Sequence, residues 1–282
     1  MKPTSIPLIA LVLLSSLPAV AQTQAATSAG ELQLGVEAYK NSHYEQAIEH
    51  FQKAVDLDGS NLNAHLYLAK TLVSQYIPGV ESPDNISAAE RAIEQYQQVL
   101  NASSEPTQRI NSAKGVAYLY LNMKKFDDAK KYYQMASDID PNDSEPFYSI
   151  GVIDWAKCYE PRMETRARLG LRPGDNLDPR NAAQKKACDA LIVKNWQTVL
   201  DGIDSLKRAV ALRPDYDDAM AYMNLMYREK ADLECDDLAA RAEDLKTAGD
   251  WVDKTLAVKK AKARHAQGEG LPDPGPQLSD KP

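Results

Sequence analysis

The chain contains 282 residues, of which 44% are apolar, and it carries a formal net charge of −7. This negative charge disfavours nucleic acid as a partner. No two of the four histidines lie four residues apart, so neither a helical metal site nor another cofactor is expected.

The first predicted element is a secretory signal peptide at residues 1–21. Met1 and Lys2 precede an apolar run over residues 6–17, and Ala19-Val20-Ala21 has the small residues of a cleavage site. The run is too short to span a bilayer, and no later segment is apolar enough to do so. We therefore expect cleavage after Ala21, export to the periplasm or the exterior, and no membrane span in the mature chain. Retention of the run as an anchor is the alternative.

After a short linker at 22–27, a helix-pair pattern recurs along the chain. Equivalent positions of successive units are occupied mostly by small residues: Gly35, Ala69, Ala117, Gly151 and Asn224. Gly35 and Ala69 are 34 residues apart, and so are Ala117 and Gly151. The wider gaps fit the same stride with inserted residues. A period of this length is typical of stacked helix pairs that bury their apolar faces against one another.

The first and third units show the pattern most clearly. In the first unit, the small residues Gly35 and Ala47 lie on two different helices and allow them to approach closely. Phe51 and Ala54 then turn the second helix towards the next unit. The third unit ends at Pro141, which stops its second helix. The matching residues of the third unit are Ala117, Tyr120, Phe126, Ala129, Tyr133 and Ala136.

These motifs resemble the tetratricopeptide repeat, whose signature combines a Leu-Gly or Leu-Ala pair, a later small residue, an aromatic residue, an alanine and a terminal proline. The resemblance implies an all-α fold, a right-handed superhelix (α-solenoid) of about five helix pairs over residues 28–265. The units fall at about 28–61, 62–105, 110–143, 144–216 and 217–265, with a loop inserted in the second unit and a long insertion, 158–194, in the fourth. The Gly- and Pro-rich end predicts a disordered tail at 266–282.

The insertion at 158–194 departs from the acidic average of the chain. Its net charge is positive, and four arginines crowd its first half: Arg162, Arg166, Arg168 and Arg172. This pattern indicates either a solvated helix face or a docking patch for an acidic partner. Asp175 and Asp178 lie in a Pro/Gly-rich turn of the insertion and are interpreted as turn formers.

The three cysteines suit an oxidising compartment. Cys158 and Cys188 bracket the insertion, and a bond between them would tie it off. We therefore predict a Cys158–Cys188 disulfide with Cys235 free. The sequence leaves two alternatives open, a bond to Cys235 as the competing partner and a set of buried free thiols.

Tetratricopeptide pairs place the first helix of each unit on the inside of the superhelix, so the resemblance implies a binding surface there. We expect this surface to bind a peptide or an amphipathic helix of another protein through apolar anchors and carboxylates. The expected partner-binding residues are Tyr39, Lys70, Lys114, Tyr118, Asn122, Tyr148, Trp155 and Arg228. The alternative for Tyr148 and Trp155 is that they pack under the neighbouring insertion.

The function expected from the resemblance is a non-enzymatic protein-interaction scaffold or adaptor of the cell envelope or periplasm. One alternative is a cell-wall enzyme with its site in the insertion at 158–194, although the sequence has no nucleophile elbow, zinc helix, phosphate loop or convincing carboxylate pair. The other alternative is a structural protein that self-associates through its end repeats.

Overall fold

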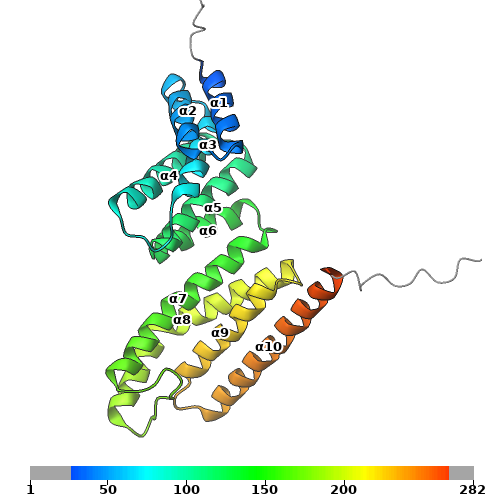
Figure 1. Cartoon of the computed structure of the whole chain (residues 1–282). Helices are drawn as coiled ribbons and strands as arrows, with labels where there is room; N and C mark the ends of the chain where they lie inside the picture. Colours follow the sequence, from blue (N-terminus) through cyan, green and yellow to red (C-terminus); the bar gives the residue numbers. More distant parts are fainter. Residues whose placement is uncertain (1–26, 267–282) are drawn as a thin grey trace, which may run out of the picture.

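The computed structural model describes residues 27–266, and this part of the chain forms ten helices and no strand (Figure 1). The predicted signal peptide at 1–21 lies outside the described residues, as do the linker and the tail apart from Thr27 and Ala266. The helices are α1 (Ser28–Lys40), α2 (Tyr44–Leu57), α3 (Leu62–Gln75), α4 (Pro83–Ala102), α5 (Pro106–Asn122), α6 (Phe126–Ile139), α7 (Ser144–Arg168), α8 (Ala182–Leu212), α9 (Asp217–Leu233) and α10 (Leu238–Ala266).

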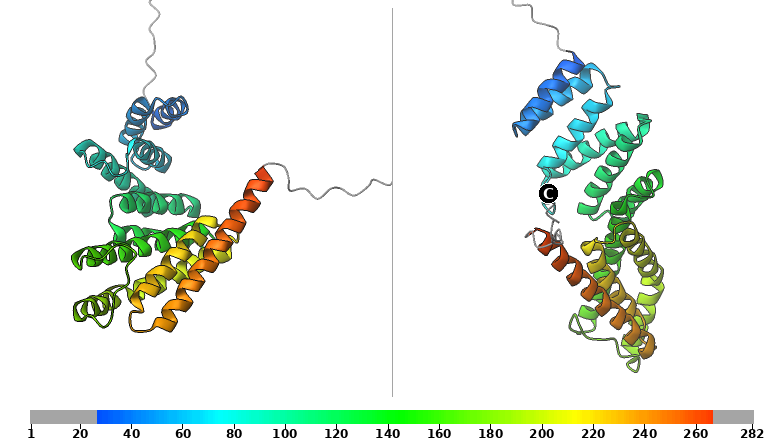
Figure 2. Two further views of the ribbon diagram at one scale, coloured as in Figure 1. Left: turned by 60° about the horizontal axis from the view of Figure 1, so that its bottom comes forward. Right: turned by 90° about the vertical axis from the view of Figure 1, so that its right-hand side faces the viewer.

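The ten helices form five consecutive pairs, each made of a first and a second helix. Each second helix packs against the first helix of its own pair and, in the first four pairs, against the first helix of the next pair. First helices of neighbouring pairs also touch, α1 with α3, α3 with α5, and α7 with α9. These contacts place the first helices on the inner side of a curved stack (Figure 2). The predicted all-α solenoid of about five pairs is confirmed.

Several helices begin at a short polar side chain. Thr27 precedes α1, Asn61 precedes α3, Ser82 precedes α4 and Asn181 precedes α8. Each side-chain oxygen accepts a hydrogen bond from an N–H group of the first turn, which has no partner within the helix. These caps help to fix where each of the four helices begins.

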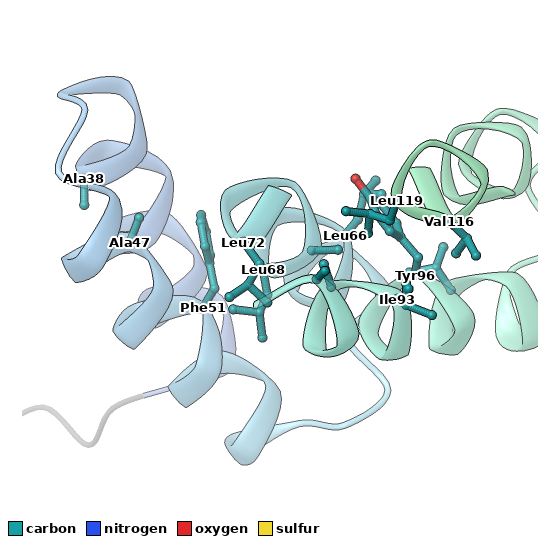
Figure 3. Packing of buried hydrophobic residues seen from close by; sticks show 14 residues of the cluster. Ala38, Ala47, Phe51, Leu66, Leu68, Leu72, Ile93, Tyr96, Val116 and Leu119 are labelled. Atoms are coloured by element: carbon teal, nitrogen blue, oxygen red, sulfur yellow. The ribbon is translucent and has the colours of Figure 1, made fainter. Parts of the chain in front are cut away.

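Small residues let the two helices of a pair approach closely. A Cβ atom added at Gly35 of α1 would lie 2.5 Å from the ring of Phe51 on α2. Phe51 is fully buried in the core of the first three pairs (Figure 3), and its ring stacks on Tyr67 of α3 with centroids 5.4 Å apart. In the fourth pair, a Cβ atom at Gly151 would lie 2.4 Å from Leu206. The predicted contact role of these glycines is confirmed.

The two inserted stretches have different structures. In the second pair, a loop at 76–82 joins α3 to α4 and is held by Asn85, whose side-chain amide accepts from the Ile77 N–H and donates to the Ile77 and Val80 carbonyls. In the fourth pair, the extra residues mostly lengthen α7 and α8, and only residues 169–181 lie between these helices. The insertion at 158–194 is therefore an extension of the helix pair.

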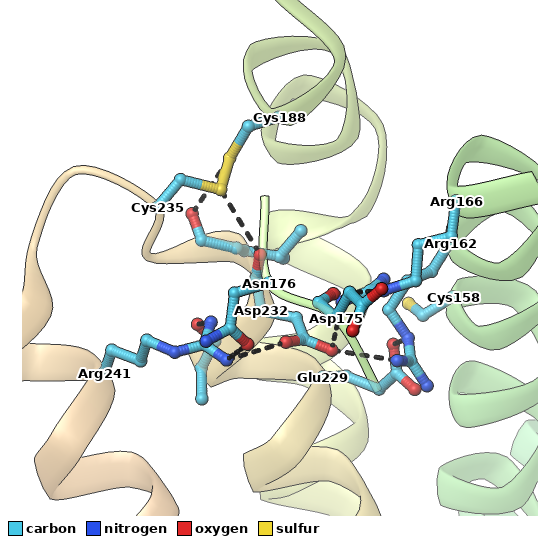
Figure 4. A network of polar contacts seen from close by, with 12 residues as sticks. Cys158, Arg162, Arg166, Asp175, Asn176, Cys188, Glu229, Asp232, Cys235 and Arg241 are labelled. Atoms are coloured by element: carbon cyan, nitrogen blue, oxygen red, sulfur yellow. Dashed lines mark hydrogen bonds and ion pairs between the residues drawn. A yellow bond between two sulfur atoms is a disulfide. The ribbon is translucent and has the colours of Figure 1, made fainter. Parts of the chain in front are cut away.

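The disulfide links Cys188 of α8 to Cys235, which follows α9, with Cα atoms 6.6 Å apart (Figure 4). The predicted Cys158–Cys188 bond is wrong, since Cys158 is a buried free thiol whose Sγ lies 4.0 Å from the Asn195 carbonyl oxygen. Because α7 and α8 run antiparallel, Cys158 lies level with Asn195, about two helical turns or about 10 Å from Cys188 along α8. A disulfide does not bridge such a distance.

Candidate functional site on the inner surface

The eight residues expected to bind a partner all lie on first helices of the solenoid. Their positions are α1 for Tyr39, α3 for Lys70, α5 for Lys114, Tyr118 and Asn122, α7 for Tyr148 and Trp155, and α9 for Arg228. These helices lie on the inner side of the stack, where α1 touches α3, α3 touches α5 and α7 touches α9. The eight side chains differ in their exposure and in whether they already pack or form hydrogen bonds and ion pairs within the chain.

Three of the eight side chains are accessible. Lys70 and Arg228 are exposed, and Tyr118 is 41% exposed. Within residues 27–266, neither Lys70 nor Arg228 forms an ion pair; Arg228 makes only a long contact, 3.4 Å from its Nε to Oδ1 of Asn224. A cation without a partner and an exposed phenol are groups that an incoming chain can use for charge pairing and apolar contact.

Lys114 and Asn122 already have partners within the chain. The Lys114 Nζ lies 2.9 Å from the Asp143 carboxylate and also contacts Glu145, so it joins α5 to the start of α7. Burial favours the neutral amine, but the hydrogen bonds to Glu145 and Asp143 outweigh it and raise the pKa of Lys114. Asn122 donates its side-chain N–H to the Tyr118 carbonyl oxygen of its own helix. Both residues therefore contribute to local structure.

Tyr148 and Trp155 belong to an aromatic cluster between α7 and α9. The Tyr148 ring lies 4.8 Å from Tyr216 and 5.7 Å from Tyr222, measured between centroids. Trp155 lies 4.8 Å from Tyr159 and 5.5 Å from Tyr222. Desolvation raises the pKa of Tyr148 and Tyr222, so these phenols stay neutral well above physiological pH.

The partly buried rings of this cluster join the inner sides of the fourth and fifth pairs. Sequence reasoning missed Tyr159, Tyr216 and Tyr222. The signal available for Tyr159 was its position four residues after Trp155, on the same helix face. Tyr39 is also partly buried, with its ring 5.5 Å from that of Tyr44.

The arginines of the predicted basic patch are mostly engaged within the chain (Figure 4). Arg162 binds Glu229 at 2.8 Å and Asp232 at 2.9 Å, and Arg166 binds Asp232 at 3.0 Å. Arg241 of α10 reaches the other oxygen of Asp232 at 3.3 Å. Arg162 and Arg166 therefore tie the lengthened α7 to α9 and are withdrawn from the surface.

The outer end of the insertion is held by local ion pairs. Arg172 binds Asp175 and Arg180 binds Asp178, each at 2.9 Å. These hydrogen bonds lower the pKa of both carboxyl groups, so Asp175 and Asp178 are ionised. The structure supports the interpretation of the two aspartates as turn formers.

Stability is expected to fall between about pH 5 and pH 8 because of Glu229. Burial raises the pKa of Glu229 to about 7, against the opposing effect of Arg162. In the unfolded chain this carboxyl ionises near its ordinary value, so the folded state holds a proton that the unfolded state has lost. The stabilisation that this proton provides is fully present below the ordinary pKa of a glutamate and is lost as the pH rises through about 7. Urea unfolding across this range should show a fall of about 1–3 kcal/mol.

The matched variant for this titration is Glu229→Gln, which keeps the shape but cannot ionise. It should remove the part of the pH dependence that Glu229 contributes and leave the part that comes from Asp154, whose pKa burial also raises. An unchanged slope in Glu229→Gln would assign the dependence to other groups.

Residues 27–266 contain no cluster of His, Cys, Asp and Glu that could hold a metal ion. The same residues include no helix with the length and apolar character needed to cross a membrane.

Comparison with known proteins supports the repeat pattern. The tetratricopeptide-repeat family profile matches residues 32–61 and 115–143, in the first and third pairs. A stretch of 112 residues is 32% identical to the STIP1 homolog of Dictyostelium discoideum. This stretch is 40% of the present chain and 19% of that protein, so the chain spans about a fifth of the length of this relative.

Solved structures share the fold at low sequence identity. A MamA structure matches with a TM-score of 0.56 and 13% identity, over 88% of this chain and 98% of that one. MamA of Desulfovibrio magneticus RS-1 matches with a TM-score of 0.53 and 12% identity, over 83% and 96%. YrrB, described as a TPR protein with an unusual peptide-binding site, matches with a TM-score of 0.50 and 14% identity, over 84% and 92%. Two tetratricopeptide repeats are therefore matched within this chain, and its five stacked helix pairs have the fold of these solved structures.

Proposed function

We propose that the chain is a non-enzymatic scaffold that binds another protein by holding an extended peptide or an amphipathic helix along the inner surface of the solenoid. The observation that carries the proposal is the set of accessible side chains on three of the five first helices, Lys70 on α3, Tyr118 on α5 and Arg228 on α9. YrrB supports it by analogy, since a peptide-binding site is described for that protein of similar fold.

The proposed contacts divide into two parts. Lys70 and Arg228 supply positive charge for carboxylates of the partner, and Tyr118 supplies an apolar anchor with a polar tip. The half-buried cluster of Tyr148 and Trp155 forms a rigid apolar floor, because its rings already pack on α9. Rigid aromatic surfaces lose little side-chain entropy on binding and are common at binding hot spots.

Alanine substitutions test the proposal. Lys70→Ala, Tyr118→Ala and Arg228→Ala should each keep the free energy of unfolding within about 0.5 kcal/mol of wild type, because these side chains are exposed. Combined, they should weaken partner binding at least about tenfold. Partners would first be captured from an envelope extract and identified, and a purified partner would then be titrated by calorimetry.

The matched controls are Lys53→Ala on α2 and Lys186→Ala on α8, exposed cations on second helices. They should leave affinity unchanged. If the controls and the inner-surface variants lost affinity equally, the partner would be attracted by the general charge of the surface. A triple variant that binds as wild type would refute binding at the inner surface.

The proposal also locates the scaffold outside the cytoplasm, in the periplasm or beyond. The layout of residues 1–21 supports export, and the Cys188–Cys235 bond is of a kind that persists in oxidising compartments. Intact-mass analysis of the exported protein should find a chain that begins just after Ala21. Retention of Met1, or a cytoplasmic location of the folded protein, would contradict this part of the proposal.

A further inference from the structure

The last helix, α10, has an apolar stripe along one exposed flank. Six positions alternate in steps of four and three residues, the spacing of a coiled-coil seam. They are Leu238, Ala242, Leu245, Gly249, Val252 and Leu256, which we call the α10 stripe. Its large members are 73% (Leu238), 38% (Leu245), 37% (Val252) and 59% (Leu256) exposed, and a Cβ atom at Gly249 would meet nothing within 4 Å.

The α10 stripe lies on the flank where a further repeat would stack. Ala248 and Thr255, on another face of α10, are buried, and Thr247 lines a surface pocket together with the α8 residue Leu200. The stripe points away from α8. Elsewhere in the stack the next pair covers this flank of a second helix, as α3 covers α2 at Phe51. As the final helix of the described stack, α10 lies at its outer edge beside α9 (Figures 1 and 2).

We propose that the α10 stripe is the contact between two copies of this chain, which pair α10 against α10 in antiparallel orientation. The sizes along the stripe favour this occupant. In an antiparallel pair, Leu245 of one copy can oppose Gly249 of the other, and Val252 can oppose Ala242. Large side chains then fill the space above small ones, whereas a parallel pair would set Gly249 against Gly249 and leave a gap.

Charges beside the stripe are also complementary to themselves. Lys246 and Asp253 are exposed neighbours on one edge of the stripe, and neither forms an ion pair within the described part of the chain. In an antiparallel pair, Lys246 of one copy lies beside Asp253 of the other. The symmetry of the pair produces this contact twice. A parallel pair would place like charges level with each other. The charges beside the α10 stripe are therefore complementary to those of a second copy of the same helix.

The test is the oligomeric state of the exported, full-length mature protein, measured by sedimentation equilibrium over a wide concentration range. Wild type should dimerise, and Leu245→Glu combined with Val252→Glu should weaken the dimer by about a hundredfold, because four buried carboxylates would meet in the seam. Val193→Glu on α8 is the control, since Val193 is 89% exposed and lies off the stripe. Helical circular dichroism should stay at wild-type values in all of them, and so should the melting temperature at concentrations where wild type is monomeric.

Charge exchange tests the orientation. Lys246→Asp and Asp253→Lys, made singly, should each weaken the dimer about tenfold, and the two together should restore it. Failure of the double exchange to restore affinity would overturn the antiparallel assignment. A wild-type chain that stays monomeric would overturn the proposal, and flotation of that monomer with anionic vesicles would assign the stripe to a lipid surface.

Discussion

Replacing Lys130 with methionine is expected to destabilise the fold by about 3–5 kcal/mol, because it leaves a buried carboxylate without its counter-charge. Asp154 on α7 is fully buried, and both of its oxygens accept from the Lys130 Nζ of α6, at 2.8 and 2.9 Å. Burial raises the pKa of Asp154, and the Lys130 ammonium opposes that rise. Urea unfolding at neutral pH should show the loss, which should shrink in acid, where Asp154 can be neutralised by a proton.

Two further variants isolate the pair. Lys131→Met removes an exposed neighbouring cation and should change stability by less than about 0.5 kcal/mol. Lys130→Met combined with Asp154→Asn removes both charges and should recover part of the loss, as expected when the penalty comes from the unpaired charge. A single Lys130→Met variant as stable as wild type would mean that Asp154 finds water or another partner.

Removal of the Cys188–Cys235 bond should destabilise the chain by about 4 kcal/mol on the loop-entropy model, since the two residues are 47 apart in sequence. The bond ties the start of α8 to the connection between α9 and α10, so its loss frees the lengthened end of the fourth pair. Cys188→Ala combined with Cys235→Ala should lower the melting temperature, and a reducing agent should lower that of wild type in the same way.

Cys158→Ala is the control for reduction. Burial raises the pKa of the Cys158 thiol to about 12, so this cysteine is protonated and unreactive at neutral pH. The variant should keep the response of the wild type to a reducing agent. Non-reducing peptide mapping that linked Cys158 to Cys188, or no response of the wild type to reduction, would contradict the observed pairing.

The helix pairs could be predicted because their determinants are local. Gly35 and Ala47 belong to one pair, and close approach requires a small side chain at both positions whatever the rest of the stack does. The same 34-residue spacing recurs between Ala117 and Gly151, so the pattern of one unit helps to predict the others.

The disulfide could not be predicted from the positions of Cys158 and Cys188, which bracket the insertion. Which cysteines meet depends on how α8 lies along α7 and on where the chain turns after α9. The insertion was expected to need a bond across its ends, but it consists of two helix extensions that the disulfide and the arginines of α7 join to the fifth pair. Arg162 and Arg166 likewise point to acids of α9, Glu229 and Asp232, far away in the sequence.

The inner surface was predictable in position and less so in composition. The repeat register assigned all eight candidates to first helices, and the structure has them there. It did not show that Lys114 is neutralised by Asp143 and Glu145 of the next pair. Nor did it show that Tyr148 packs on Tyr222, because contacts between neighbouring pairs depend on how the pairs stack.

Site-specific photo-crosslinking tests the central claim, that the partner binds the inner surface, most directly. A photoreactive phenylalanine analogue would replace either Tyr118, on the inner surface, or Val193, which is 89% exposed on a second helix. Cells making each variant would be irradiated, and cross-linked proteins identified by mass spectrometry. The proposed binding mode predicts one dominant partner cross-linked at position 118 and absent at position 193. A partner cross-linked at position 193 and never at position 118 would contradict it.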